Sequence, residues 1–172
     1  ENTPKLVIGA LGGHCVGGGL EIALACDLRI ARKGSGRTGL PEVTLGVLPG
    51  TGGTQRLARL VGKAKAIELM VTGKQLSFDT AKEIGLVHEV WDASPAEWWE
   101  QVLAYARQFV PPNKAAKAVG NIKRAVCSGI EVPFESALAI ERELQQLLFQ
   151  SEDAKEGIRS YVEKRVPVFK GS

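Results

Sequence analysis

Residues 12–21 read Gly-Gly-His-Cys-Val-Gly-Gly-Gly-Leu-Glu and follow a short apolar run over 6–11. The apolar run is typical of a buried strand, and residues 20–25, after the glycines, are good helix formers. The stretch therefore predicts a strand, a glycine turn, a helix and then a second strand over 27–31. Because the first N–H groups of a helix are unpaired and carry partial positive charge, glycines here let an anionic oxygen approach the backbone.

The same glycines also have a simpler interpretation. They allow a strand and a helix to pack tightly, and Glu21 is then an ordinary acid in the first helical turn, where the helix dipole favours it. Neither common nucleotide-binding motif fits, because no Lys-Ser or Lys-Thr follows the glycines and the spacing does not match GxGxxG. On this segment alone, an oxyanion or phosphate site and a packing role are both open.

A second carboxylate stands in Gly-Leu-Pro-Glu at 39–42, and Gly-Val-Leu-Pro-Gly-Thr-Gly-Gly-Thr-Gln-Arg-Leu follows at 46–57. Proline stiffens a loop and glycine permits unusual backbone angles, and loops of this kind commonly hold functional groups. Pro41 would fix the approach to Glu42. For an isolated Pro-Glu pair, however, a solvated turn glutamate is the more common case.

The remaining pattern indicates an α/β chain whose last part is helical. Ser94, Pro95 and Glu97 form a capping-box signature at the start of one helix. We expect short helices over 54–61, 64–71 and 77–83, a strand over 86–90, and longer helices over 95–109, 114–127, from 133, and over 153–165. The corresponding division is a mixed core part, 1–92, and a helical part, 93–172.

Composition excludes several classes of protein. With 172 residues and 44% hydrophobic content the chain suits one compact domain, and its net charge of +3 is too small and too dispersed for a dedicated nucleic-acid binder. Three cysteines suggest no disulfide framework, which indicates a reducing compartment, most simply the cytoplasm. No run is apolar enough to span a membrane and no signal-peptide pattern is present, so we expect a soluble intracellular protein.

Metal ligands are sparse in the sequence. His14 lies beside the glycine cluster, but His88 is the only other histidine, and Cys15 and Cys26 are not at zinc spacing. The sequence therefore predicts no metal site.

The segments 16–27 and 39–57, with Glu156-Gly157 and Val162-Glu163-Lys164-Arg165 near the end, together resemble the enoyl-CoA hydratase/isomerase (crotonase) superfamily. In that family a strand, a Leu-Gly-Gly-Gly-x-Glu-type helix start, a Pro-Glu turn and a Pro-Gly-x-Gly-Gly-Thr-Gln-Arg-Leu segment occur in this order. The resemblance implies a crotonase (ClpP/crotonase-like) spiral of ββα units with a C-terminal helical trimerisation region. It also implies that the N-terminal part of the fold is absent from this chain.

The resemblance further implies an enoyl-CoA hydratase, which adds water to a 2-enoyl-CoA thioester and gives a 3-hydroxyacyl-CoA. Gly18 matches the residue whose backbone N–H forms half of the oxyanion hole, and Glu21 and Glu42 match the two catalytic glutamates. In the division of roles that we favour, Glu21 activates the water and protonated Glu42 delivers a proton to the α-carbon. The substrate-binding positions that the resemblance implies are Gly17, Gly19, Pro41, Gly50, Tyr161 and Lys164.

Two of these positions, Tyr161 and Lys164, match an aromatic residue and a lysine that reach coenzyme A in relatives, often from a neighbouring subunit. On one helix they serve packing and solvation equally well. Two glutamates favour hydration, since isomerases of the family generally keep only the second; an isomerase or a specialised branched-chain or aromatic-pathway hydratase is the alternative. The loop Lys33-Gly34-Ser35-Gly36-Arg37 is slightly longer than is usual between the glutamates.

The resemblance also sets the expected partners. Coenzyme A is part of the substrate and no separate cofactor is implied, while the subunits are expected to form homo-trimers that pair into hexamers. The second oxyanion-hole donor and most of the adenine pocket belong to the earlier segment, so we expect a fragment or a second polypeptide that supplies it. A remote alternative is a non-catalytic assembly or RNA-binding role, for which the basic residues on one predicted helix are Lys114, Lys117, Lys123 and Arg124.

Overall fold

The computed structural model describes all residues, 1–172, and contains two compact units. One unit consists of Glu1 and Val7–Val102, and the other of Asn2–Leu6 and Leu103–Ser172. The division into functional parts, 1–92 and 93–172, stays a prediction.

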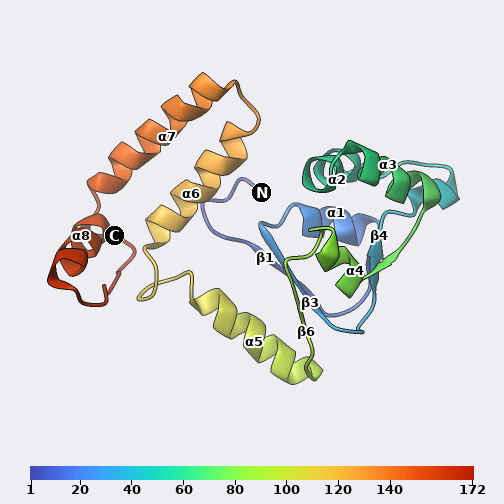
Figure 1. Cartoon of the computed structure of the whole chain (residues 1–172), viewed down its shortest axis with the longest axis horizontal. Coiled ribbons are helices and arrows are strands. Elements are labelled where there is room, and N and C mark those ends of the chain that lie inside the picture. Colours follow the sequence, from blue (N-terminus) through green and yellow to red (C-terminus); the bar gives the residue numbers. More distant parts are fainter. The chain divides into compact units, whose positions relative to one another are not determined.

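The first unit begins with two repeats in which a pair of strands precedes a helical segment (Figure 1). The first repeat comprises β1 (Ile8–Leu11), β2 (Cys15–Val16) and α1 (Gly18–Leu24). The second comprises β3 (Leu28–Arg32), β4 (Arg37–Gly39), the 3-10 helix η1 (Glu42–Leu45), α2 (Gly53–Val61) and α3 (Lys63–Thr72). The unit continues with β5 (Leu76–Ser77), α4 (Phe78–Glu83), β6 (Glu89–Trp91) and the part of α5 (Pro95–Arg107) up to Val102.

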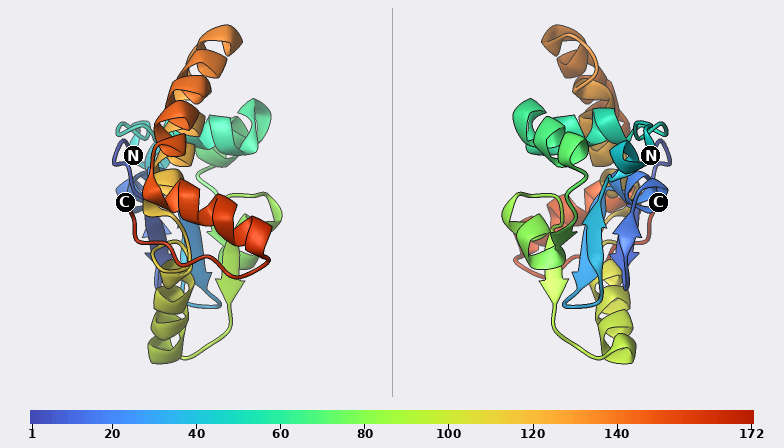
Figure 2. Two further views of the ribbon diagram at one scale, coloured as in Figure 1. Left: turned by 90° about the vertical axis from the view of Figure 1, so that its left-hand side faces the viewer. Right: turned by 90° about the vertical axis from the view of Figure 1, so that its right-hand side faces the viewer.

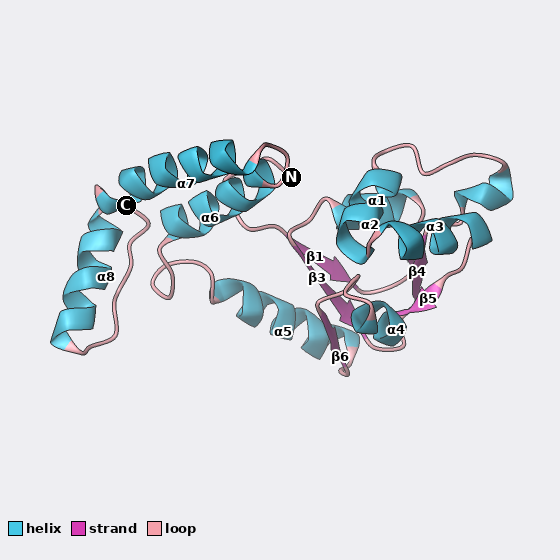
Figure 3. Ribbon diagram, turned by 45° about the horizontal axis from the view of Figure 1, so that its top comes forward, coloured by secondary structure: helices cyan, strands magenta, loops and turns pink.

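The strands of each repeat separate into two sheets. The first strands join the parallel sheet β1-β3-β6, whose members lie side by side in Figure 3, and Ile8 pairs with Leu28 at the start of its register. The second strands form the sheet β2-β4-β5, in which β4 is parallel to β2 and antiparallel to β5. Repetition of strand, strand and helix across two sheets is the spiral of ββα units that the family resemblance implies.

The interior of the first unit is filled by aliphatic and aromatic side chains from every repeat. Residues that are 1% exposed or less include Leu20 of α1, Ile30 of β3, Leu57 of α2 and Phe78 of α4. Burial of such side chains supplies the main favourable free energy of folding. The buried side chains hold helices α1, α2 and α4 against the strands. This packing fixes the positions of the helix starts, where Glu21 and its hydrogen-bond donors lie.

Helix α5 begins as its sequence predicts. The Ser94 N–H donates to Glu97 Oε2 at 3.1 Å, and the Glu97 N–H donates to Ser94 Oγ at 3.4 Å. These reciprocal bonds satisfy two of the unpaired donors at the helix start, as in a capping box. The predicted helix start at Pro95 is confirmed, and the helix ends at Arg107, two residues before the expected Phe109.

The second unit is mainly helical. It contains α6 (Ala116–Gly129), α7 (Phe134–Phe149) and α8 (Glu152–Glu163), followed by an extended tail. Helices α6 and α7 pack side by side in opposite directions (Figures 1 and 2). Lys123 on α6 is 7% exposed, and its Nζ donates to the Lys5 carbonyl at 3.0 Å, so this lysine does not belong to a solvated basic face.

The sequence missed the shortest strands. Residues 33–37 were expected to be loop, but Arg37 is the first residue of β4, and β2 and β5 are only two residues long. Strands this short carry no hydrophobic periodicity, because alternation needs at least four residues to be visible. The strand expected over 86–90 lies at Glu89–Trp91, since Leu86 and Val87 are buried outside the ladder, each 1% exposed.

None of the helices combines the length and the apolar character that crossing a membrane requires.

Helix α2 offers a matched test of this core. Leu57 is 1% exposed and Leu60 is 39% exposed on the same helix. We expect Leu57→Ala to lower the free energy of unfolding by about 2–5 kcal/mol, because it leaves a cavity. Leu60→Ala should change it by about 0.5 kcal/mol. Urea titration followed by circular dichroism measures both, and equal losses in the two variants would contradict the described packing of α2.

Candidate active site

The first glutamate, Glu21, lies in the first turn of α1 and is 5% exposed. Gly17 precedes this helix with φ 59° and ψ −133°, angles that a residue with a side chain rarely adopts. The Glu21 N–H donates to the Gly17 carbonyl at 3.0 Å, so the helix starts directly at the glycine turn. The glycine turn therefore sets the start of the helix and, with it, the direction in which the Glu21 side chain points.

The carboxylate of Glu21 is bound to the start of α2. Its Oε1 accepts the N–H groups of Thr51 and Gly53, each at 2.8 Å, and its Oε2 accepts the Thr51 hydroxyl. The start of a helix has unpaired N–H donors and partial positive charge, both of which favour a carboxylate. Helices α1 and α2 lie next to one another (Figure 1), and Glu21 connects them.

These contacts control the ionisation of Glu21. Burial raises the pKa of its carboxyl, but the hydrogen bonds from Thr51 and Gly53, with the nearby positive charge of Arg56, lower it by more. The pKa of Glu21 therefore lies below its ordinary value. The carboxylate form dominates at neutral pH, and this form can accept a proton.

The close approach of Glu21 to α2 requires a glycine at position 53. A Cβ added to Gly53 would lie 2.9 Å from Glu21 Oε1 and 2.8 Å from the Cβ of Pro49. Both distances are below the sum of the van der Waals radii, so no larger residue fits without displacing the carboxylate.

The second glutamate, Glu42, has different surroundings. It begins η1 directly after Pro41, and its Oε2 is buried without a donor from the chain. Its Oε1 faces Gly17, where an added Cβ would lie 3.3 Å away. An unpaired buried carboxylate oxygen is costly, so this oxygen is suited to a hydrogen bond with a bound molecule.

The glycine turn contacts both glutamates in different ways. The Gly17 carbonyl accepts the Glu21 N–H, Gly17 faces Glu42 Oε1, and the backbone of Gly18 and Gly19 forms the exposed start of α1. An added Cβ at Gly18 or Gly19 would meet nothing within 4 Å. Their N–H groups belong to the first turn, where donors lack partners within the helix. An anionic oxygen could approach this surface.

Pro41 and Gly50 lie on the segments that lead into these elements. Pro41 precedes η1, and its carbonyl accepts the N–H of Thr44 at 2.9 Å. Gly50 is exposed in the loop before α2, next to Thr51. His14, by contrast, is held by the backbone, since its Nδ1 accepts the Arg37 N–H at 3.3 Å. No group of three His, Cys, Asp or Glu side chains is placed to hold a metal ion.

Tyr161 and Lys164 lie in the second unit, at the end of α8. Tyr161 is 87% exposed, and Lys164 is the C-cap with left-handed angles, φ 53° and ψ 40°. This conformation is uncommon for a residue other than glycine. Tyr161 is placed by the helix itself, whereas the chain turns back along α8 after Lys164, so the position of Lys164 depends on what holds that turn.

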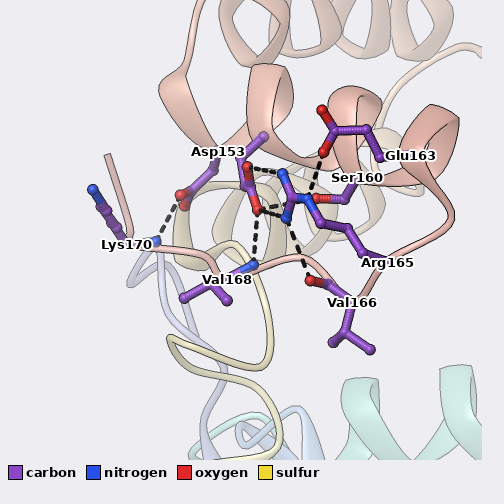
Figure 4. A network of polar contacts seen from close by, with 8 residues as sticks. Asp153, Ser160, Glu163, Arg165, Val166, Val168 and Lys170 are labelled. Carbon is purple, nitrogen blue, oxygen red and sulfur yellow. Dashed lines mark hydrogen bonds and ion pairs between the residues drawn. The ribbon is translucent and has the colours of Figure 1, made fainter.

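Two carboxylates of α8 hold the turn and the tail (Figure 4). Glu156 forms a paired contact with the Arg165 guanidinium at 2.6 and 2.9 Å and accepts the Val168 N–H at 3.1 Å. Asp153, 2% exposed, accepts the N–H groups of Lys170 and Gly171 at 2.7 and 2.8 Å. Hydrogen bonds from Arg165, the Val168 N–H and the Ser160 hydroxyl hold the pKa of Glu156 well below its ordinary value.

Sequence reasoning missed Thr51 and Gly53 as partners of Glu21. The segment that contains them was recognised, but no spacing rule connects position 21 with position 51. The available signal was the pair Gly52-Gly53 at a predicted helix start, where neither residue supplies a capping side chain. A capping group from another element was therefore needed, and Glu21 supplies it.

The comparisons with known proteins agree with this fold. The model of the enoyl-CoA hydratase/isomerase family matches residues 1–172. A probable enoyl-CoA hydratase of Bacillus subtilis (strain 168) is 42% identical over 171 residues, 99% of this chain and 65% of that protein. The 2,3-dehydroadipyl-CoA hydratase of Escherichia coli (strain K12) is 40% identical over 171 residues, 97% of this chain and 64% of that protein.

A solved structure gives the same result. The crystal structure of an enoyl-CoA hydratase from Geobacillus kaustophilus HTA426 is 51% identical, has a TM-score of 0.93 and covers 99% of this chain and 63% of that chain. The fold is therefore the crotonase fold, as predicted. The chain belongs to the enoyl-CoA hydratase/isomerase (crotonase) family. It spans 54–65% of the length of the most similar curated relatives.

A substitution at Gly53 tests the contact between Glu21 and α2. We expect Gly53→Ala to lower the free energy of unfolding by about 1–3 kcal/mol, because the added methyl group displaces the carboxylate or Pro49. Gly13→Ala is the control, since an added Cβ there meets nothing within 4 Å. Urea denaturation at pH 7 measures both, and a Gly53→Ala protein as stable as the Gly13→Ala protein would contradict the contact.

A second substitution tests the C-terminal network. In Glu156→Gln the charged contact with Arg165 is lost, so amide hydrogen exchange at Val168 should become roughly tenfold faster at neutral pH. In the parent protein the same loss should occur only on acidification through the lowered pKa of Glu156, below its ordinary range. Glu152→Gln, which loses only an exposed ion pair with Lys155, is the control. Unchanged exchange at Val168 in Glu156→Gln would refute the role of this carboxylate.

Proposed function

We propose that the protein is an enoyl-CoA hydratase, which adds water in syn fashion across the double bond of a 2-enoyl-CoA thioester. The observation that carries the proposal is the contrast between two carboxylates beside one glycine turn. Glu21 is bound by three donors, whereas Glu42 Oε2 is buried without a donor from the chain. One carboxylate held by donors and one with an unpaired oxygen suit two different roles in the reaction.

The proposed reaction uses each carboxylate once. Glu21, with its lowered pKa, accepts a proton from water while the water oxygen bonds to the β-carbon. Glu42 carries a proton and gives it to the α-carbon, and exchange between the two carboxyl groups and solvent then restores the starting state. One water is consumed and one 3-hydroxyacyl thioester is formed, so atoms and charges balance.

The proposed activation of the thioester comes from the helix start. Electron density moves from the double bond onto the thioester oxygen as water adds, and a donor placed at that oxygen stabilises the charge. We assign this role to the N–H of Gly18, at the positive end of α1. Gly17, Gly19, Pro41 and Gly50 are proposed to shape the surrounding surface.

The substrate class is a coenzyme A thioester, and coenzyme A is part of that substrate. The relatives bear names for different acyl groups, such as 2,3-dehydroadipyl-CoA, so the acyl chain of this protein is not assigned. Tyr161 and Lys164 are proposed to contact coenzyme A, and the held turn after α8 supports a defined position for Lys164. Cytoplasmic localisation stays a prediction.

Assembly into trimers or hexamers is part of the proposal. Apolar side chains are exposed on η1 and the following loop and on the helices of the second unit, which supports coverage by other protein surface. The exposed residues include Leu45, Leu48, Ile122, Phe134 and Tyr161. RNA binding is disfavoured, because Lys123 is buried and the remaining cations on α6 form no dense stripe.

Substitution of each glutamate tests the proposal. The protein should consume crotonyl-CoA, with loss of the ultraviolet absorbance of the conjugated thioester. Glu21→Gln and Glu42→Gln should each lower the rate by about 10²–10⁴-fold, as expected for loss of a general acid or base. Glu68→Gln, which alters an exposed carboxylate paired with Lys65 on α3, is the matched control and should retain parental activity.

Two outcomes would overturn this assignment. A folded parent protein that leaves the absorbance unchanged is not a hydratase for this substrate. If the same protein generates the absorbance from a 3-enoyl-CoA, and only Glu42→Gln abolishes that gain, the function is double-bond isomerisation.

A further inference from the structure

Thr51 contacts both oxygens of the Glu21 carboxylate. Its backbone N–H donates to Oε1 at 2.8 Å, and its side-chain hydroxyl donates to Oε2. Gly53 adds a backbone N–H to Oε1, also at 2.8 Å. The two backbone donors are available to any residue at these positions, whereas the donor to Oε2 depends on the side chain of residue 51.

The hydroxyl limits how Glu21 can bind anything else. An ionised carboxylate has about four acceptor directions, two on each oxygen. On Glu21 the N–H groups of Thr51 and Gly53 take both directions of Oε1, and the Thr51 hydroxyl takes one direction of Oε2. One acceptor position of Oε2 therefore stays available for another donor. The Thr51 hydroxyl occupies the other position, so it determines where a further donor can bind Oε2.

Thr51 is itself held in place. The Nη1 of Arg56 donates to the Thr51 carbonyl at 2.9 Å, and the backbone N–H of Arg56 donates to the Gly52 carbonyl at 2.9 Å. The branched side chain of threonine has few favoured rotamers. The hydroxyl is thus fixed by the backbone turn before α2 and by its bond to Glu21.

We propose that Thr51 is a positioning residue for water addition: its side-chain hydroxyl fixes the Glu21 carboxylate so that water binds Oε2 in one direction. The inference rests on the proposed function because it assumes that Glu21 accepts a proton from the attacking water. The orientation of the carboxylate by the hydroxyl does not depend on the reaction.

Two substitutions separate the hydroxyl from the rest of the side chain. Thr51→Val keeps the branched shape and the backbone N–H but removes the donor, whereas Thr51→Ser keeps the donor. In Thr51→Val we expect kcat for crotonyl-CoA hydration to fall about 10–100-fold with KM changed less than about threefold, because water is no longer held in line. In Thr51→Ser we expect kcat within about threefold of the parent value.

The dependence of kcat/KM on pH separates this role from a general structural defect, because a structural defect would lower kcat/KM without shifting its pH dependence. The hydroxyl bond lowers the pKa of Glu21, so its loss raises that pKa. The acid limb of kcat/KM should therefore move to higher pH by about one unit in Thr51→Val and stay in place in Thr51→Ser. Thr72→Val is the control, since its hydroxyl bonds only to backbone carbonyls of α3.

A measurement without substrate distinguishes failure of this inference from failure of the proposed function. Carbon-13 NMR of the glutamate carboxyl groups, with the Glu21 signal assigned by its loss in Glu21→Gln, follows the titration directly. An upward shift in Thr51→Val alone supports the inference even if the parent protein hydrates no enoyl thioester. An unshifted titration, or a Thr51→Ser protein as impaired as Thr51→Val, overturns it.

Discussion

The bond between the Glu21 carboxylate and the first N–H groups of α2 is the contact on which the geometry of the first unit depends. A helix start presents unpaired donors and partial positive charge, and a buried carboxylate needs both. The contact positions the loop before α2, because Thr51 and Gly53 bind the same carboxylate oxygen. The group proposed to take part in the chemistry is thus also the group that caps the next helix.

This double use explains why the two glutamates differ. The N–H groups of Thr51 and Gly53 and the Thr51 hydroxyl donate to Glu21, so the ionised state of Glu21 is favoured even though the side chain is buried. Glu42 begins a short 3-10 helix after a proline and has no such partner for Oε2. The fold therefore separates the two environments mainly through the helix start that Glu21 faces, and the positive charge of Arg56 adds to this effect at Glu21.

Much of the fold follows from local sequence signals, and the site follows only in part. The helix after the glycine cluster and the capping box of Ser94 and Glu97 are set by neighbouring residues, so the sequence predicted them. Two-residue strands are set by pairing with distant segments and leave no periodic pattern. The bond from Thr51 to Glu21 spans thirty positions and depends on how α1 packs against α2, which no local pattern records.

Some glycines near the site are required by the fold itself, and others are not. Gly17 has a positive φ, and Gly53 would clash with Glu21 if it carried a Cβ, so the fold itself explains both. Gly18 and Gly19 have neither constraint, and glycine in a helix costs about 0.5–1 kcal/mol relative to alanine. Nothing inside the chain offsets that cost. A molecule that approaches the exposed backbone from outside would explain these two glycines, and this supports the proposed oxyanion site at Gly18.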